Sequence, residues 1–167
     1  METDKARRAA GVRRGHMTVV ASLVDKPPNL GGICRACDVL GVERMTVNDL
    51  AVARHPSFVS VAVTADQWLP LEEVPEAGVA AYLRAQKRAG YTLIGLEQTD
   101  KSVQLSPALE FPERCVLLLG KEKEGIPTEL LLELDFCVEI RQVGVVRSMN
   151  IQTATAVVIH AYSSQHC

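Results

Sequence analysis

The stretch Arg114-Cys-Val-Leu-Leu-Leu-Gly-Lys-Glu-Lys-Glu-Gly125 decides the fold class. Its first six residues, 114–119, are almost all apolar and predict a strand that is buried on both faces. The charged segment that follows is bounded by Gly120 and Gly125, which predicts a loop at the carboxyl end of this strand. A strand covered on both faces is typical of a parallel sheet with a layer of helices on each side.

Apolar runs and helix signals alternate along the rest of the chain. We predict strands over residues 17–24, 43–47, 68–74 (part of it loop), 91–96, 114–119 and 136–140, and helices over residues 29–40, 75–89, 127–134 and 150–164. Residues 57–65 fit a short helix or a strand equally well, and Pro107 and Pro112 frame a loop. Gly41 and Gly90 follow two of the predicted helices, where glycine commonly ends a helix. The pattern predicts an α/β domain with a mostly parallel sheet and helices on both faces.

The composition indicates one folded domain. A chain of 167 residues, with 47% hydrophobic and 23% charged residues, is long enough for a sizeable core. No stretch approaches the ~20 apolar residues of a membrane span, and the start is too polar for a secretory signal. The five cysteines lack an extracellular disulfide spacing, which favours a reducing compartment. We therefore expect an intracellular protein of the cytoplasm or nucleus, without a membrane partner.

The net charge of −2 is unevenly distributed. Residues 1–16 hold five basic and two acidic side chains, a net charge of +3, whereas the rest of the chain holds 13 basic and 18 acidic ones, a net charge of −5. We therefore divide the chain into a basic, flexible extension over residues 1–16 and a domain over residues 17–167. Basic extensions touch phosphates in some proteins and are solvated tails in others, and the sequence leaves both interpretations open.

Three short blocks place polar side chains inside or beside apolar elements. The first, Asn29-Leu-Gly-Gly-Ile-Cys-Arg35, opens a predicted helix with an asparagine and carries an arginine within it. The second is the loop 120–125, which contains Glu122. The third, Ser148-Met149-Asn150, opens the last helix, after a loop that follows the strand ending at Ile140. Each block also has an ordinary interpretation, because Asn and Ser cap helices and single charged residues are usually solvated.

Several other classes of site are not supported. No G-x-G-x-x-G follows the first strand, which argues against a Rossmann dinucleotide site. The loop 120–125 resembles a P-loop only superficially, because Ile126-Pro127 stand where Lys-Ser/Thr would follow. Cys34 and Cys37 have C-x-x-C spacing but lie inside a predicted helix without a second pair at metal-ligand distance. We interpret them as core residues rather than a redox or zinc site and expect no metal.

Taken together, the three blocks resemble the SPOUT superfamily of RNA methyltransferases, in particular its TrmH/SpoU branch, whose members methylate ribose 2′-hydroxyls. Order and spacing match over residues 17–165: Asn29-x-Gly31-x-x-x-Arg35, then Gly120-x-Glu122-x-x-Gly125, then Ile140 to Ser148-x-Asn150. The chain is also similar to the C-terminal methyltransferase domain of a much larger RNA-binding protein. It departs from the family pattern at Arg141-Gln142, since many members have proline directly after the position of Ile140.

The resemblance implies S-adenosylmethionine as cofactor and S-adenosylhomocysteine as product. It also implies a C-terminal trefoil knot, which chain periodicity cannot predict because knotted chains are very rare. The cofactor-binding residues implied by the resemblance are Leu96, Gly120, Ile140 and Met149. The catalytic residues implied are Arg35, Asn29, Glu122, Ser148 and Asn150.

Arg35 is the residue on which the implied mechanism depends most. In the family this arginine is assigned a catalytic role, sometimes as the base, but a guanidinium stays protonated in proteins. We instead expect Arg35 to clamp the phosphate beside the target ribose. Without the resemblance, Arg35 would be read as part of an exposed helix face, and Ile140 and Met149 as core residues.

The resemblance further implies an RNA substrate, a homodimer whose active site is completed across the interface, and a larger parent protein upstream. The apolar run over residues 154–161 supports the dimer, because it exceeds what one buried helix face needs. Similarity to the larger RNA-binding protein points to tRNA and its D-loop guanosine, the G18-type site. We therefore expect a tRNA (guanosine-2′-O-)-methyltransferase. Two alternatives stay open: the same chemistry on another RNA such as rRNA, and a non-catalytic cofactor-binding dimerisation module.

Overall fold

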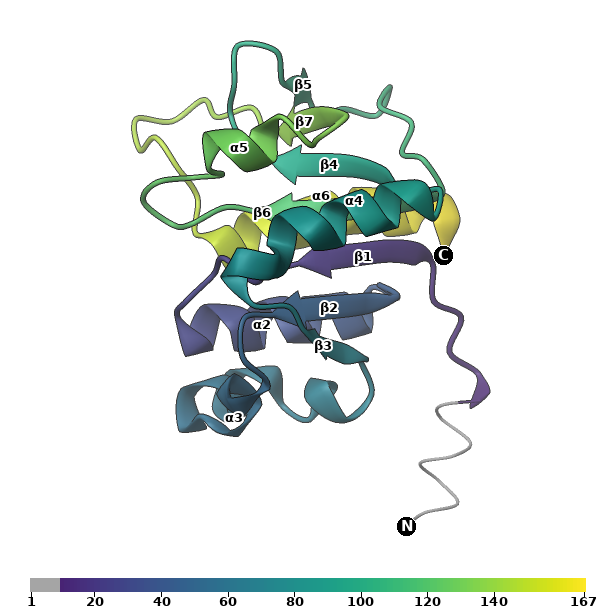
Figure 1. Cartoon of the computed structure of the whole chain (residues 1–167), viewed down its shortest axis with the longest axis vertical. Coiled ribbons are helices and arrows are strands. Elements are labelled where there is room, and N and C mark those ends of the chain that lie inside the picture. Colours follow the sequence, from purple (N-terminus) through teal and green to yellow (C-terminus); the bar gives the residue numbers. More distant parts are fainter. Residues whose placement is uncertain (1–9) are drawn as a thin grey trace.

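A seven-stranded parallel sheet organises the chain (Figure 1). The computed structural model describes residues 10–167, and the strand order is β3-β2-β1-β6-β4-β7-β5. The strands are β1 (His16–Val20), β2 (Arg44–Val47), β3 (Leu71–Glu73), β4 (Thr92–Leu96), β5 (Val103–Gln104), β6 (Arg114–Leu119) and β7 (Phe136–Glu139). All neighbouring pairs are parallel, so the carboxyl ends of these strands share one edge of the sheet.

Helices cover both faces of the sheet, as the sequence predicts (Figure 1). The helices α2 (Pro27–Val39), α3 (Pro56–Ala62) and α6 (Ile151–His166) pack on one face, and α4 (Val79–Arg88) and α5 (Thr128–Leu131) on the other. Short 3-10 helices span Leu50–Arg54, Ala65–Gln67 and Glu76–Gly78. Successive side chains of β6 alternate between the two cores, with Leu117 in the first and Val116 in the second. No helix within residues 10–167 is long and apolar enough to cross a membrane.

The connections that follow the adjacent strands β1 and β6 leave toward opposite faces. After β1 the chain enters α2 on one face, and after β6 it enters α5 on the other. Such a divergence opens a crevice at the carboxyl edge of a parallel sheet, where α/β proteins bind ligands. The fold therefore places the first and second polar blocks on the two sides of one crevice.

The helices α2 and α6 run side by side in the same direction. Near their first residues, Asn150 Nδ2 donates to Asn29 Oδ1 at 3.1 Å. Just past their last residues, Cys167 Sγ lies 3.8 Å from the carbonyl oxygen of Gly41. The third polar block leads into α6, so this packing places it beside the first polar block at the start of α2.

Two predicted helix starts differ from the structure by one or two residues. The helix α2 begins at Pro27 with Lys26 as its cap, so Asn29 lies within the first turn and is not the cap. Proline suits this position, because the first helical residue needs no N–H partner. The last helix begins at Ile151, one residue after the predicted start at Asn150, and Asn150 caps it by accepting a hydrogen bond from the Gln152 N–H at 2.8 Å.

Other element boundaries also differ from the prediction. The strand predicted over residues 17–24 ends at Val20, the one over 68–74 shrinks to Leu71–Glu73, and the helix predicted over 127–134 shrinks to Thr128–Leu131. The ambiguous residues 57–65 fall mostly in helix α3. Strand β5 was not predicted, because two exposed residues give too short a run for a periodic signal.

The last residues of the predicted basic extension, residues 1–16, belong to the folded domain. Residues 1–9 lie outside the described residues, but His16 already belongs to β1. Arg14 is held by Asp38, with 2.6 Å between Nη2 and Oδ1, and it also donates to the carbonyl oxygens of Val42 and Trp68. This arginine therefore anchors the chain before β1 and is not a freely solvated cation.

Gly31 tests the close packing of α2 against α3. A Cβ atom at Gly31 would lie 2.6 Å from the carbonyl oxygen of Phe58, a backbone atom that cannot swing away. We expect Gly31→Ala to lower the free energy of unfolding by about 1–3 kcal/mol, as overpacking does, measured by urea denaturation. Gly78→Ala is the matched control, because a Cβ there meets nothing within 4 Å, and its effect should stay within ~0.5 kcal/mol. Equal effects of both substitutions would contradict this packing argument.

Candidate functional site

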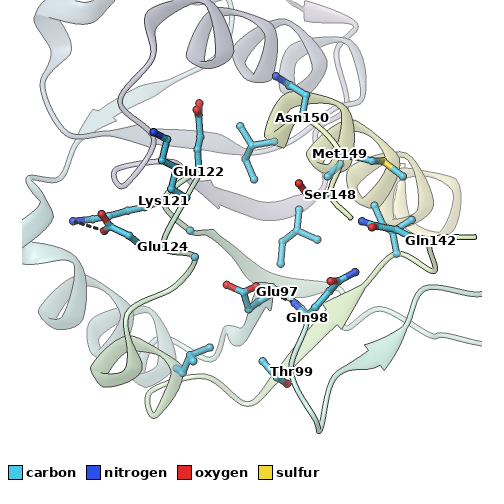
Figure 2. Close-up of a pocket in the computed structure, with 18 residues that line it drawn as sticks. Glu97, Gln98, Thr99, Lys121, Glu122, Glu124, Gln142, Ser148, Met149 and Asn150 are labelled. Carbon is cyan, nitrogen blue, oxygen red and sulfur yellow. Dashed lines mark hydrogen bonds and ion pairs between the residues drawn. The ribbon is translucent and has the colours of Figure 1, made fainter. Parts of the chain in front are cut away.

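A pocket of about 690 Å³ lies at the carboxyl edge of the sheet (Figure 2). Three segments far apart in the chain supply most of its lining: residues 96–99 at the end of β4, the loop 120–125 after β6, and residues between 140 and 154 that lead from β7 into α6. Its volume is in the range of small-molecule sites. The pocket is therefore a candidate ligand site at the edge where the topology favours one.

Most residues that the sequence predicts for the site line this pocket. They are Leu96, Gly120, Glu122, Ile140, Ser148, Met149 and Asn150. Figure 2 shows Glu122 and Asn150 toward one end of the pocket and Gln98 and Thr99 toward the other. The predicted set thus spans one cavity, although the individual roles of its members stay predictions.

Asn29 does not line the pocket but joins the other two blocks there. Its Nδ2 atom donates to Glu122 Oε1, and its Oδ1 atom accepts from Asn150 Nδ2 at 3.1 Å. Asn29 is only 9% exposed, so both hydrogen bonds are partly buried on its side. We call Asn29, Glu122 and Asn150 the polar triad. The triad contains one residue from each polar block.

Lys26 holds the far side of the triad. Its Nζ atom lies 2.6 Å from Glu122 Oε2, and the Glu122 side chain is 19% exposed. The hydrogen bond to Glu122 raises the pKa of Lys26 above its ordinary value. Both carboxylate oxygens of Glu122 therefore have a partner. Sequence reasoning could not find Lys26, because a lysine beside two prolines in a loop is usually solvated.

The loop 120–125 is a tight turn closed on itself. The Lys121 N–H donates to the Gly125 carbonyl at 3.0 Å, and the Gly125 N–H donates back to Lys121 at 2.9 Å. A Cβ atom at Gly120 would lie 2.5 Å from the carbonyl carbon of Gly125, and Gly125 itself has a φ of +71°. Both glycines are therefore required by the turn, and Gly120 also lines the pocket, so its two predicted roles coincide.

Glu97 fixes this loop and was missed by the sequence analysis. Its Oε2 atom accepts from the Ile126 N–H at 2.9 Å, and its Oε1 atom accepts from the Gln98 N–H at 3.1 Å. Glu97 also lines the pocket. Its position directly after β4, at the edge where the other site residues lie, was a signal that could have found it.

The apolar part of the lining lies between the polar ends. Leu96 and Ile140 line the pocket and also pack against the core on the face covered by α2, α3 and α6. Ile140 is therefore both a core residue and a pocket residue. Met149 is 39% exposed and is not a core residue. The pocket can therefore hold a molecule with an apolar middle and orient a hydroxyl group at the polar triad.

Arg35 is the one predicted site residue that stands apart. It is exposed on α2, does not line the pocket and has no hydrogen bond or ion pair with another residue in the range 10–167. Its predicted catalytic role is therefore not explained by the geometry of a single chain.

Cys34 and Cys37 are buried in the main core, beside Ile33. Burial raises the pKa of Cys34 to about 12 and that of Cys37 well above its ordinary value. A thiolate is the form that binds zinc or attacks a disulfide, and these thiols stay protonated. The structure therefore supports the core interpretation of this C-x-x-C spacing.

The three polar blocks and their spacing point to one protein family, and comparison with known families agrees. The model of the SpoU rRNA methylase family matches residues 16–160, most of the chain. The chain belongs to this family. The predicted membership of the TrmH/SpoU branch is thereby confirmed.

Two relatives of this SpoU domain match nearly its full length. The tRNA (guanosine(18)-2′-O)-methyltransferase of Saccharomyces cerevisiae is 57% identical over 166 residues, which are 99% of this chain and 12% of the relative. The tRNA (guanosine(18)-2′-O)-methyltransferase TARBP1 of Mus musculus is 45% identical over 167 residues, 99% of this chain and 10% of the relative. The SpoU domain thus spans about a tenth of the length of these curated relatives.

Solved structures share the fold of the SpoU domain. The TrmH/SpoU tRNA modifying enzyme of A. aeolicus superposes with a TM-score of 0.83 and 21% identity, over 98% of this chain and 82% of that one. The SpoU methyltransferase AviRb of Streptomyces viridochromogenes, in complex with the cofactor AdoMet, superposes with a TM-score of 0.77 and 23% identity, over 93% and 62% of the two chains. The parallel sheet covered by helices is therefore the family fold.

Exchanging donors and acceptors in the polar triad tests whether it forms. Asn29→Asp keeps the acceptor for Asn150 but replaces the donor that faces Glu122 with a second negative charge. We expect the free energy of unfolding to fall by about 1–3 kcal/mol at neutral pH, measured by urea denaturation. Adding Glu122→Gln supplies a donor toward the new carboxylate, so the double variant should be more stable than Asn29→Asp alone. Strictly additive effects of the two changes would contradict the contact.

Proposed function

We propose that this domain transfers a methyl group from S-adenosylmethionine to the ribose 2′-hydroxyl of a guanosine in tRNA, at the D-loop site of the G18 type. Family membership supports the reaction class, and the yeast and mouse relatives carry this activity in their names. The observation that carries the proposal is the polar triad, because it joins the three family blocks at one end of a ligand-sized pocket.

The pocket fits S-adenosylmethionine in size and lining. Leu96, Ile140 and Met149 offer apolar contacts for an adenosine group, and the loop 120–125 brings backbone groups to the same cavity. The AviRb structure, which shares the fold, holds AdoMet. When bound, the cofactor supplies a methyl group on a positively charged sulfur and leaves as S-adenosylhomocysteine. Neither a metal ion nor a nucleoside triphosphate has a role in this proposal.

The residues of the chain must orient the hydroxyl group and help to remove its proton. We assign the orienting role to the polar triad, whose amide and carboxylate oxygens accept hydrogen bonds and whose mutual contacts fix their geometry. Ser148 adds a hydroxyl group in the same pocket. Arg35 clamps the phosphate beside the target ribose through its planar guanidinium, which lowers the proton affinity of the hydroxyl. The hydroxyl proton leaves as the new carbon–oxygen bond forms and passes, by way of this phosphate, to water.

We further propose a homodimer that forms through α2 and α6. The 16 residues of α6 include no Asp, Glu, Lys or Arg. Its exposed stripe consists of Thr153, Val157, His160 and Ser164. On the neighbouring helix α2, Val39 is 73% exposed. A helical surface so poor in charge is typical of the core of an interface.

The position of Arg35 supports a site that two copies complete. Arg35 lies on the exposed side of α2, next to the surface proposed for the dimer, and does not line the pocket of its own chain. A second copy seated on α2 and α6 brings its Arg35 toward the pocket of the first. In this arrangement each pocket receives the polar triad from one chain and the arginine from the other.

The trefoil knot and the location in the cell are further proposals. Support for the knot comes from the three segments that line one pocket and from the return of α6 to α2. When the unfolded chain is pulled from its two ends, a knot keeps its end-to-end distance below that of an unknotted chain with the same number of residues. Full extension of the chain would exclude the knot.

An RNA-modifying role and five free cysteines, four of them buried, support a location in the cytoplasm or the nucleus.

Methyl transfer to RNA tests the proposed function directly. Full-length protein is incubated with tRNA and labelled S-adenosylmethionine, and ribose methylation is then mapped. We expect label at one D-loop guanosine. Transfer to rRNA alone would assign a different substrate, and cofactor binding without transfer to any RNA would indicate a non-catalytic module.

Arg35→Lys separates a phosphate clamp from a solvated surface arginine. The substitution keeps the charge but loses the planar fork, so we expect kcat to fall by about a hundredfold or more, equivalent to ~2.7 kcal/mol. Cofactor affinity and melting temperature should stay unchanged. Arg88→Lys, at the exposed end of α4, is the matched control and should leave kcat unchanged. Normal turnover by Arg35→Lys would remove Arg35 from the mechanism, and a collapse in melting temperature would make it structural.

Mixing inactive variants tests the shared active site. In a heterodimer of Arg35→Ala and Asn150→Ala chains, one pocket receives an intact triad and an intact arginine. We expect mixing to restore up to about a quarter of wild-type activity, because about half of the dimers are mixed and each has one intact site. A mixture of Glu122→Ala and Asn150→Ala chains should stay inactive, since both residues serve the same pocket. Absence of recovery in the first mixture would place Arg35 in its own chain.

A further inference from the structure

A second hollow adjoins the site pocket. It has a volume of about 500 Å³ and lies between the edge strand β5, its neighbour β7 and the segment 141–147. Gln98, Ile140 and Gln142 line both cavities, so the two are adjacent. The proposed reaction uses only the first cavity. The second one is large enough for part of a larger substrate.

The side chains of this hollow combine free cations with a fixed anion. Arg141 and Arg147 line it, and neither has a hydrogen bond or ion pair with another residue in the range 10–167. Glu139 also lines it, and its Oε2 atom accepts from Ser102 Oγ at 2.7 Å, which fixes the carboxylate on β7. A simple anion would be repelled by Glu139, and a simple cation by the two arginines.

A nucleotide of an RNA chain suits this combination. A guanidinium binds a phosphate in a bidentate manner, and a carboxylate accepts hydrogen bonds from the amino group of adenine, cytosine or guanine. Uracil has no amino group and can offer a carboxylate only its ring N3–H. The chemistry of the hollow therefore suits a phosphate and favours an amino-bearing base over uracil.

The segment 141–147 also exposes apolar side chains, of which Val146 lines the hollow. Val143, Val145 and Val146 are 85%, 98% and 79% exposed. Three highly exposed valines between two arginines without ion-pair partners in the described residues are unusual for a solvated loop. Exposed apolar groups of this kind mark interaction sites. Aliphatic side chains can pack against the face of a base while the flanking arginines hold its phosphates.

The nucleotide in this hollow is not the one that is methylated. The methylated ribose has to reach the polar triad, and Figure 2 shows Glu122 and Asn150 toward the opposite end of the pocket from Gln98. Gln98 is one of the residues that border the second hollow. The hollow therefore takes a neighbouring nucleotide of the same RNA strand.

We infer that the hollow between β7 and the segment 141–147 binds a nucleotide next to the methylated one, whose base carries an amino group. This inference rests on the proposed function, since it takes RNA as the substrate. Arg141 and Arg147 contact the phosphates of this nucleotide, Glu139 accepts from its base, and Val146 packs against the base. The subsite sets a preference of the enzyme for the sequence around the target.

Arginine variants of the full-length protein test the phosphate contacts. We expect Arg141→Ala and Arg147→Ala each to weaken RNA binding and raise the KM for RNA by about tenfold, with kcat and cofactor affinity nearly unchanged. The slope of log affinity against log salt concentration should fall by about 1 for each lost contact. Arg88→Ala, remote on α4, is the control and should change none of these quantities. Unchanged RNA affinity in both loop variants would overturn the subsite.

Base substitution in the RNA tests the role of Glu139. With the nucleotides on either side of the target changed one at a time to uridine, wild-type protein should lose about tenfold or more in kcat/KM at one position. Glu139→Gln keeps a partner for Ser102 but removes the charge, and it should abolish that discrimination. Wild-type methylation with no uridine effect at any flanking position would overturn the subsite alone. Absence of methylation combined with arginine-dependent RNA binding would contradict the proposed function and leave the subsite supported.

Discussion

The side chain of Asn29 is the contact on which the arrangement of the site depends. Its amide donates to Glu122 through nitrogen and accepts from Asn150 through oxygen, so it connects the loop after β6 with the start of α6. A carboxylate at this position could not donate to Glu122. The two contacts meet at the largely buried side chain of Asn29, so they add a specific polar contact to the apolar packing that brings these chain segments together.

The backbone topology makes this contact possible. The adjacent strands β1 and β6 send their connections to opposite faces, and the crevice between them is where Asn29 meets Glu122. The parallel packing of α2 and α6 then delivers Asn150, with Gly32 leaving room for the side chain of Gln152. Each polar group at the site is thus held by an element whose own position is set by apolar packing.

Three neighbouring surfaces of the domain have different chemical character. One edge of the sheet carries the pocket and the second hollow, the outer side of α6 has no Asp, Glu, Lys or Arg, and the segment 141–147 exposes valines between arginines. These surfaces border one another around α6 and its preceding loop. An RNA strand bound at the pocket would therefore meet both the segment 141–147 and, in the proposed dimer, the arginine of the second copy.

The sequence by itself determined the α/β class, the strand β6, seven of the residues that line the pocket and the family, because buried strands are continuous apolar runs and the three blocks keep a fixed spacing. It did not determine that Asn29 lies inside its helix, that Lys26 and Glu97 hold Glu122 and the loop 120–125, or that β5 exists. It also gave no reason to separate Arg35 from the other predicted residues. Only the tertiary structure decided these points, since hydrogen bonds between segments 90 or more residues apart leave no periodic trace in the chain. Local patterns record which residues are buried, but packing decides which of the remaining polar groups meet.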